Sequence, residues 1–160
     1  MIKISQNKTL DESDRAILRA LQTKGNLSTV ELARRISLST PATHTRLKRL
    51  QDQGYIHHYA AIVDREKAGY DLMCFVHISL QVHQPEQVEK IRDAIRQMPE
   101  VLECHHVTGE YDYILKVALR NRKDLERFLM DRLTPVPGMA RIHTSLVLNE
   151  VKATTALPLD

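Results

Sequence analysis

The alternation of side chains over residues 72–83 constrains the fold more than any other feature of this sequence. One set is wholly apolar: Leu72, Cys74, Val76, Ile78, Leu80 and Val82. The intervening set is mixed: Met73, Phe75, His77, Ser79, Gln81 and His83. Because successive side chains of a strand point to opposite faces of its sheet, residues 72–83 are predicted to form a strand with one face in a core.

Helix and strand patterns continue through the rest of the second half. A helix is predicted between Pro85 and Pro99, and a second one is predicted to begin after Asn121. Strands are predicted over 101–108 and 111–119, with the turn Gly109-Glu110 between them, and a last strand over 142–148. This order predicts an α+β fold, with a ferredoxin-like βαββαβ domain whose helices cover one face of an antiparallel sheet.

The other face of that sheet is predicted to be an interface. On the first strand it carries Met73, Phe75 and His77, which is more apolar than a face left in water. Exposed apolar faces usually mark contacts between proteins. We therefore expect this face to pack against a second copy of the chain, which forms at least a dimer.

The first half has helical periodicity instead. Asp11 is expected to cap a first helix, and Ser28 with Glu31 forms a capping box for a second. Thr40 is expected to cap a third helix, with Pro41 at its first helical position and Gly54 at its end. Two short helices joined by a turn of three or four residues predict an N-terminal winged helix-turn-helix, a DNA-binding motif.

The distribution of charge agrees with DNA binding. The net charge is +3, and residues 1–64 contain ten Lys/Arg against six Asp/Glu. No acidic residue lies between Glu31 and Asp52. A basic segment of this kind is typical of proteins that bind the phosphate backbone. A helical hairpin with a solvated basic face is the alternative.

Candidate DNA-binding residues follow from the position of the third helix. His44, Thr45 and Arg46 are expected near base edges, and Lys48 and Arg49 near phosphates. The full candidate set is Ser39, Thr40, Ala42, Thr43, His44, Thr45, Arg46, Lys48 and Arg49.

The predicted domains are a helix-turn-helix over 1–60, a linker over 61–70, the ferredoxin-like domain over 71–150 and a tail over 151–160. Residues 55–64 are rich in β-branched and aromatic side chains, so they are predicted to form an extended strand or wing. Such a segment could pair with a partner chain.

Several classes of protein are disfavoured. No stretch approaches the ~20 apolar residues of a membrane helix, and residues 1–15 lack the apolar core of a secretory signal. Two cysteines favour a reducing cytoplasm. No phosphate loop, nucleophile elbow or dinucleotide fingerprint is present, so an enzyme is not expected. Cys104, His105 and His106, with other histidines, leave a metal site as an alternative, although adjacent strand residues point to opposite faces.

Sequence motifs over nearly the whole chain resemble the Lrp/AsnC family of feast/famine regulators. They are LDESDRAILRALQ (10–22), STVELARRISLS (28–39), RLKRLQDQGYI (46–56), VTGEYDYILKV (107–117) and NEVK (149–152). The resemblance implies a DNA-binding transcription regulator of the cytoplasm and nucleoid, with no cofactor. It also implies dimers that assemble into octamers or similar, and an amino-acid effector held between dimers. His44 departs from the apolar or cysteine residue of many members, so the operator sequence stays open.

The resemblance also implies an effector site. Its residues would be His105, Val107, Gly109, Tyr111, Asp112, Tyr113, Ser145, Leu146 and Val147. Asp112 could accept a hydrogen bond from an ammonium group; the alternative is a structural role in a tight hairpin. A DNA-organising protein without an effector is the other possible function.

Overall fold

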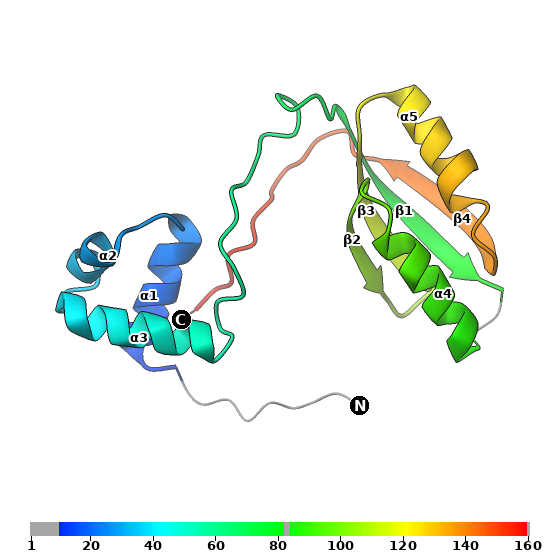
Figure 1. Ribbon diagram of the computed structural model, residues 1–160. Coiled ribbons are helices and arrows are strands. Elements are labelled where there is room, and N and C mark those ends of the chain that lie inside the picture. Colours follow the sequence, from blue (N-terminus) through cyan, green and yellow to red (C-terminus); the bar gives the residue numbers. More distant parts are fainter. Residues whose placement is uncertain (1–9, 82–83, 160) are drawn as a thin grey trace. The chain divides into compact units, whose positions relative to one another are not determined.

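The computed structural model describes residues 10–81 and 84–159. Contacts divide the chain into two units (Figure 1). The helical unit runs to Ile62 and includes the residues from Lys152 onward. The sheet unit is Val63–Val151. Each unit has its own hydrophobic core, so each is described by itself.

The helical unit contains α1 (Glu12–Thr23), α2 (Thr29–Arg35) and α3 (Thr40–Asp52). Asp11 and Ser28 cap α1 and α2 with complete capping boxes, which confirms both predicted caps. The predicted cap of α3 is wrong by one residue. Ser39 is the N-cap, because its backbone is extended while Thr40 is already helical, and Ser39 Oγ accepts from Ala42 N.

The three helices pack around a small core. Ile17, Leu32 and Leu50 are fully buried, one from each helix. Ser37, in the turn between α2 and α3, has a φ of 56°, a left-handed conformation uncommon for residues other than glycine. The core and the turn hold α2 and α3 in the helix-turn-helix arrangement that the capping signals predict.

Residues 152–159 lie on the helical unit. Gln22 and Leu157 exchange two hydrogen bonds, with Leu157 N donating to Gln22 Oε1 at 2.6 Å and Gln22 Nε2 donating to Leu157 O at 3.1 Å. Leu159 packs against the core of this unit. Residues 152–159 therefore add apolar contact and hydrogen bonds to α1.

The strand predicted over 55–64 is wrong for the single chain. No described residue between Asp52 and Leu72 forms a strand. β-Branched residues favour an extended backbone, but a strand also needs a neighbouring backbone to pair with. Ile62 and Val63 are 89% and 70% exposed, so pairing of this segment with a second chain stays a prediction.

The sheet unit has the predicted βαββαβ order. Its elements are β1 (Leu72–Leu80), α4 (Pro85–Arg96), β2 (Val101–His106), β3 (Tyr113–Leu119), α5 (Arg122–Arg127), the π-helix η1 (Phe128–Leu133) and β4 (Met139–Leu146). The strands form one antiparallel sheet in the order β2-β3-β1-β4. The ferredoxin-like prediction is confirmed.

Several strand ends differ from the prediction. β1 stops at Leu80, and Val82 and His83 lie outside the described residues. β2 ends at His106, and β3 begins at Tyr113 because residues 107–112 form the connecting turn. Leu148 lies beyond β4 and is 96% exposed. Alternation locates strands well, but hydrogen bonding to the neighbouring strand decides where they end.

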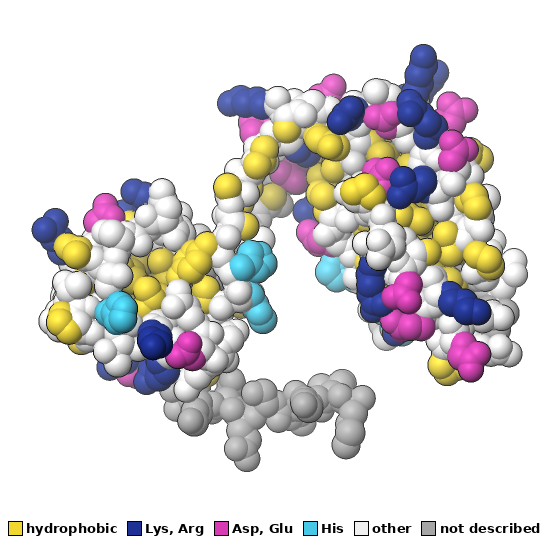
Figure 2. All heavy atoms as spheres, in the orientation of Figure 1, with side chains coloured by type: hydrophobic (Ala, Val, Ile, Leu, Met, Phe, Trp, Pro, Cys, Tyr) yellow, Lys and Arg dark blue, Asp and Glu magenta, His cyan; other side chains and the backbone are white. Residues whose placement is uncertain are grey.

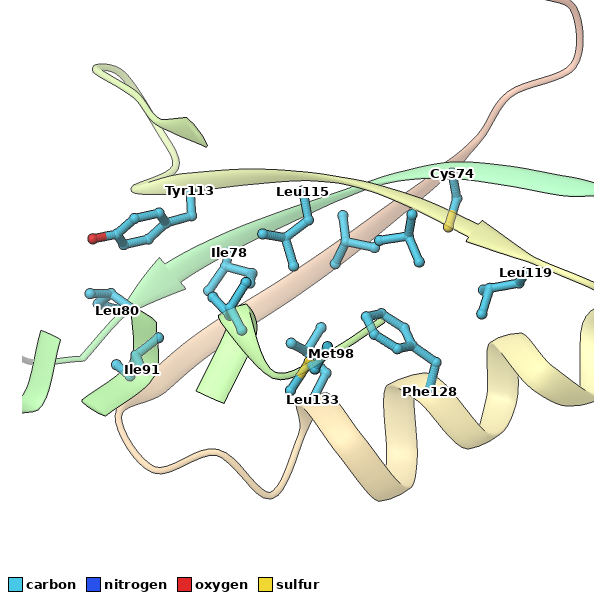
Figure 3. Packing of buried hydrophobic residues seen from close by; sticks show 13 residues of the cluster. Cys74, Ile78, Leu80, Ile91, Met98, Tyr113, Leu115, Leu119, Phe128 and Leu133 are labelled. Carbon is cyan, nitrogen blue, oxygen red and sulfur yellow. The ribbon is translucent and has the colours of Figure 1, made fainter. Parts of the chain in front are cut away.

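The core lies between the sheet and its helices (Figures 1 and 3). Cys74, Val76 and Ile78 are fully buried on β1, as alternation predicts. Phe128 and Leu133 point toward the sheet from η1 in Figure 3. On the opposite face Phe75 is 39% exposed in the single chain. Phe75 pairs with Lys116 of β3 and Ser145 of β4, so the face is partly apolar and partly polar.

Candidate functional site

Most candidate DNA-binding residues lie on the exposed side of α3. Their side chains project from the start and the middle of the helix. The exposed members are Ser39, Thr40, Ala42, His44, Thr45, Lys48 and Arg49. Small and hydroxyl side chains at the start of the helix allow a close approach to another surface. This is the end of the recognition helix that faces base edges in helix-turn-helix proteins.

Thr43 is different, because its side chain is fully buried. Its hydroxyl donates to Ser39 O at 3.0 Å, within the same helix. A side chain without exposed surface cannot contact DNA in this conformation. We therefore leave Thr43 out of the proposed contacts, although the sequence pattern placed it among them.

Two arginines of α3 pair with a buried carboxylate of α1. Asp14 is 3% exposed. Arg46 Nη1 lies 3.0 Å from Asp14 Oδ1, and Arg49 Nη2 contacts Asp14 Oδ2. These ion pairs join α1 to α3 and satisfy the buried carboxylate, as burial requires. Sequence reasoning missed them because Asp14 is 32 residues from Arg46.

Asp11 extends the same network. Its carboxylate pairs with Arg46 at 2.5 Å. The hydrogen bond from Arg46 holds the pKa of Asp11 below its ordinary value of 3.8, and the Asp11 carboxylate in turn raises the pKa of Arg46. Arg46 therefore pairs with two acidic side chains, one at the N-cap of α1 and one in its first turn. Its guanidinium is committed within the unit, so it is less available to a base edge than the sequence suggested.

Other basic residues remain open to a ligand. Arg34, Arg35 and Lys48 are exposed. No carboxylate of residues 10–81 or 84–159 forms an ion pair with any of the three. Arg34 and Arg35 lie in the acid-free window of the sequence but were not among the candidate residues. The basic surface thus includes the end of α2 as well as α3.

The turn between β2 and β3, residues 107–112, holds the second candidate site. Asp112 organises it through three hydrogen bonds. Leu80 N donates to Asp112 Oδ2 at 2.7 Å, Asp112 N donates to Ile78 O at 2.9 Å, and Val107 N donates to Asp112 O at 3.0 Å. Gly109 has a φ of +119°, which suits glycine. The carboxylate of Asp112 thus ties the turn to the end of β1.

Tyr111 lies within a group of rings and charges on the open face of the sheet. Its ring centroid is 5.0 Å from that of His77 and 6.3 Å from that of His143. Arg141 stacks over the Tyr111 ring at 5.0 Å and pairs with Glu110. Sequence reasoning missed Arg141 and His143, because only the register between β1 and β4 brings them opposite the turn.

The predicted effector residues do not form one pocket in a single chain. Tyr113 is buried on the helix side, where its hydroxyl accepts from Arg92 Nε at 2.9 Å. His105 is exposed and bonds Glu103, and this hydrogen bond holds the pKa of Glu103 below its usual range.

Ser145, Leu146 and Val147 lie at the other end of β1. Leu146 is opposite Cys74, whereas the turn bonds Ile78 and Leu80. Beside the turn is an open hollow of about 600 Å³, with Val107, Thr108, Tyr111 and Ile114 in its wall.

No three His, Cys, Asp or Glu side chains among residues 10–81 and 84–159 are grouped as a metal site. No helix in the same part of the chain has the length and apolar character needed to cross a membrane.

Comparison with known families identifies the family of the chain that carries these surfaces. A model of the Lrp/AsnC ligand binding domain matches residues 73–157, and a winged helix-turn-helix DNA-binding model matches residues 10–57. The chain belongs to the Lrp/AsnC family. This confirms the resemblance seen in the motifs. The protein is a DNA-binding transcription regulator with a ligand-binding domain, and its family is regulatory rather than enzymatic.

Relatives and solved structures cover the whole architecture. Transcriptional regulator AzlB of Bacillus subtilis is 34% identical, over 94% of this chain and 96% of its own. The leucine-responsive regulatory protein of Escherichia coli is 35% identical, over 94% and 92%. A Neisseria meningitidis transcriptional regulator solved with L-methionine has a TM-score of 0.92 and 37% identity, over 95% and 98%. A feast or famine regulatory protein of Mycobacterium tuberculosis, also with L-methionine, has a TM-score of 0.85 and 29% identity, over 95% and 100%.

Proposed function

We propose that this Lrp/AsnC protein contacts DNA with the exposed side of α3. The observation that supports it is the placement of Ser39, Thr40, Ala42, His44 and Thr45, all exposed at the start of that helix. These side chains would face base edges in the major groove. Lys48, Arg34 and Arg35 would contact phosphates. Arg49 pairs with Asp14 but keeps 46% of its side chain exposed, so it would also contact a phosphate from its exposed side.

We propose an amino acid as the effector, bound beside the turn 107–112. Two solved relatives hold L-methionine, and the ligand-binding model spans this region. Glu110 and Arg141 form an ion pair at 2.5 Å beside Tyr111, and an amino acid would exchange this pair for its own two charges, the ammonium at Glu110 and the carboxylate at Arg141. A DNA-organising protein without an effector is the alternative, and ligand binding discriminates between them.

The effector site is proposed to need more than one chain. In the single chain, Ser145 to Val147 lie away from the turn, so a second copy would have to bring an equivalent strand to it. The open sheet face with Phe75 is the proposed dimer contact, and dimers would assemble further into octamers or another multiple. A regulator of this kind would act on the chromosome in the cytoplasm.

The salt dependence of DNA binding tests the proposed surface. Loss of one phosphate contact lowers the slope of log K against log salt by about one unit. We expect this for Lys48→Ala. Lys24→Ala is the matched control, because Lys24 is an exposed lysine at the end of α1, outside the proposed surface. Equal slopes for Lys48→Ala and the unchanged protein would remove Lys48 from the interface.

A thermal-shift screen against the twenty amino acids tests the effector. A ligand at 100-fold over its dissociation constant stabilises the folded protein by about 2.7 kcal/mol. We expect one or a few amino acids to raise the melting temperature. An unchanged melting temperature with all twenty would favour the effector-free alternative. Sedimentation at micromolar concentration tests assembly, where a clean monomer would contradict the proposed dimer.

A further inference from the structure

A row of four side chains crosses the open face of the sheet, and three of them are histidines. His77 of β1 is opposite Ile114 of β3 on one side and His143 of β4 on the other. Ile114 is in turn opposite His105 of β2. Residues opposite each other on neighbouring strands project from the same face of a sheet. The open face therefore carries an imidazole on three of its four strands.

His77 lies inside this row and is partly closed off from water. Its Nδ1 atom is buried and has no hydrogen-bond partner among residues 10–81 and 84–159. Its ring centroid is 5.0 Å from that of Tyr111 and 5.8 Å from that of His143. No ion pair joins His77 or His143 to an acid in the described part of the chain, and Asp112 of the nearby turn accepts from Leu80 N. A positive charge on either ring therefore has no acidic partner there.

The other charges of this face are paired with one another. The four strands contain three charged side chains besides histidine, namely Glu103, Lys116 and Arg141. Glu103 lies 3.1 Å from Lys116 Nζ and 3.1 Å from His105 Nε2, and Glu110 of the turn lies 2.5 Å from Arg141. Hydrogen bonds from His105 and Lys116 hold the pKa of Glu103 below its usual range, so Glu103 keeps its charge in mild acid. The two acids and two bases cancel, and the face is neutral while its histidines are neutral.

Neutrality suits this face to a second copy of the chain. An identical copy presents the same charges, and like charges brought together across an interface repel each other. The open face, with Phe75 and Ile114 among its apolar members, avoids this repulsion at neutral pH. The helix-covered side of the sheet unit is different, because Figure 2 shows acidic and basic side chains interspersed over α4 and α5. That side has the mixed charges of an ordinary solvated surface.

Mild acid removes the neutrality of the open face. Histidine ordinarily gains its proton near about pH 6.5. Since the other four charges cancel, three protonated histidines would give the face of each copy a charge of +3. Protonated His77 and His143 would also repel each other, because like charges directly opposite each other in a sheet are destabilising. Contact with a second copy would remove the water that hydrates these charges.

We infer that the contact between copies through this sheet face is a pH switch, which forms while His77 and His143 are neutral and breaks when they gain protons. This switch rests on the proposed dimer contact, because it regulates that same face. The sign follows from the charges. Association is complete above the range in which histidine titrates, and it is lost as the pH falls through that range.

Sedimentation equilibrium of the full chain at about pH 7.5 and about pH 5.5 tests the switch. If each copy must release one proton in order to associate, the dissociation constant should rise about tenfold per copy, or about 100-fold for a dimer. His77→Phe and His143→Phe each keep an aromatic ring that cannot be protonated. We expect each variant to reduce the rise, and the double variant to remove most of it.

His106→Phe is the matched control. His106 is on the same sheet but on the helix side, where its ring stacks on Tyr113 at 4.9 Å. This variant should show the same rise as the unchanged protein. A dimer with one dissociation constant at both pH values would overturn the switch and leave the proposed dimer in place, whereas a monomer at both would overturn the two together. An undiminished rise in the double variant would assign the pH dependence to other groups and would also overturn the switch.

Discussion

Asp14 in the helical unit and Asp112 in the sheet unit are both internal carboxylates, but they bond different partners. Asp14 pairs with the side chains of Arg46 and Arg49, two residues of the proposed DNA-binding helix. Asp112 accepts from the backbone N–H of Leu80. The first carboxylate therefore decides how much charge α3 offers to DNA. The second decides the shape of the turn at which we propose an effector.

The difference shows why residue type alone did not reveal either role. Asp112 suggested a ligand for an ammonium group, whereas its carboxylate is engaged within the chain. Asp14 looked like an ordinary acid in the first turn of a helix, whereas it holds two basic residues of another helix. In both cases the partner determines the role, and it is an arginine pair for Asp14 and a strand end for Asp112.

The largest effect is expected for Asp14→Asn. Removing one member of a buried ion pair costs about 3–5 kcal/mol, but Arg46 and Arg49 are partly exposed and can be hydrated, so we expect about 2 kcal/mol. Hydrogen exchange at the α1 and α3 amides would measure it, because it reports opening of the helical unit alone. The freed arginines should also steepen the salt dependence of DNA binding.

Glu12→Gln is the control for Asp14→Asn. Glu12 is also in the first turn of α1, but its side chain is 74% exposed and pairs with Arg19. Exposed pairs contribute little, so less than about 1 kcal/mol should be lost. If both variants lost the same stability, the ion pairs of Asp14 would have no special structural role.

A smaller effect is expected at Asp112, and two variants separate its roles. Asp112→Ala leaves the Leu80 N–H without its acceptor, at a cost of about 1–2 kcal/mol. Asp112→Asn keeps an oxygen that can accept, so the turn should persist. Thermal denaturation with and without L-methionine measures both the stability of each variant and its response to the ligand. A ligand response kept by Asn and lost by Ala indicates a structural role, and loss in both indicates contact with the effector.

The smallest effect is a dependence on pH at Asp11. Its pKa is lowered in the folded chain by the hydrogen bond from Arg46, so its contribution is complete above 3.8 and is lost as the pH falls through the lowered value. The helical unit should therefore lose stability in this acidic range.

Asp11→Asn tests that dependence. Asparagine caps helices as well as aspartate, so α1 should be kept while the dependence is reduced. Arg46→Gln should reduce it in the same way, since it removes the partner. Hydrogen exchange of α1 between about pH 5 and pH 3 is the measurement. An identical decline in all three proteins would exclude the Asp11–Arg46 pair as its source.

The sequence by itself determined the elements of this protein and its family. The alternation over 72–80, the caps at Asp11 and Ser28, the helix start after Asn121 and the βαββαβ order all depend on neighbouring residues, and each is present in the structure. The strand predicted over 55–64 failed because extended propensity does not supply a pairing partner. The predicted cap of α3 was wrong by one residue, because Ser39 and Thr40 are adjacent and both residue types can cap a helix.

Only the tertiary structure decided which charges remain available and which residues meet. The pairing of Asp14 with Arg46 spans 32 residues, and Tyr111 meets Arg141 only through the register of β1 and β4. The packing of the elements also buried Thr43 and placed Tyr113 on the helix side of the sheet. The physical reason is that periodicity and capping act within a few residues, whereas burial and ion pairing depend on how distant elements pack.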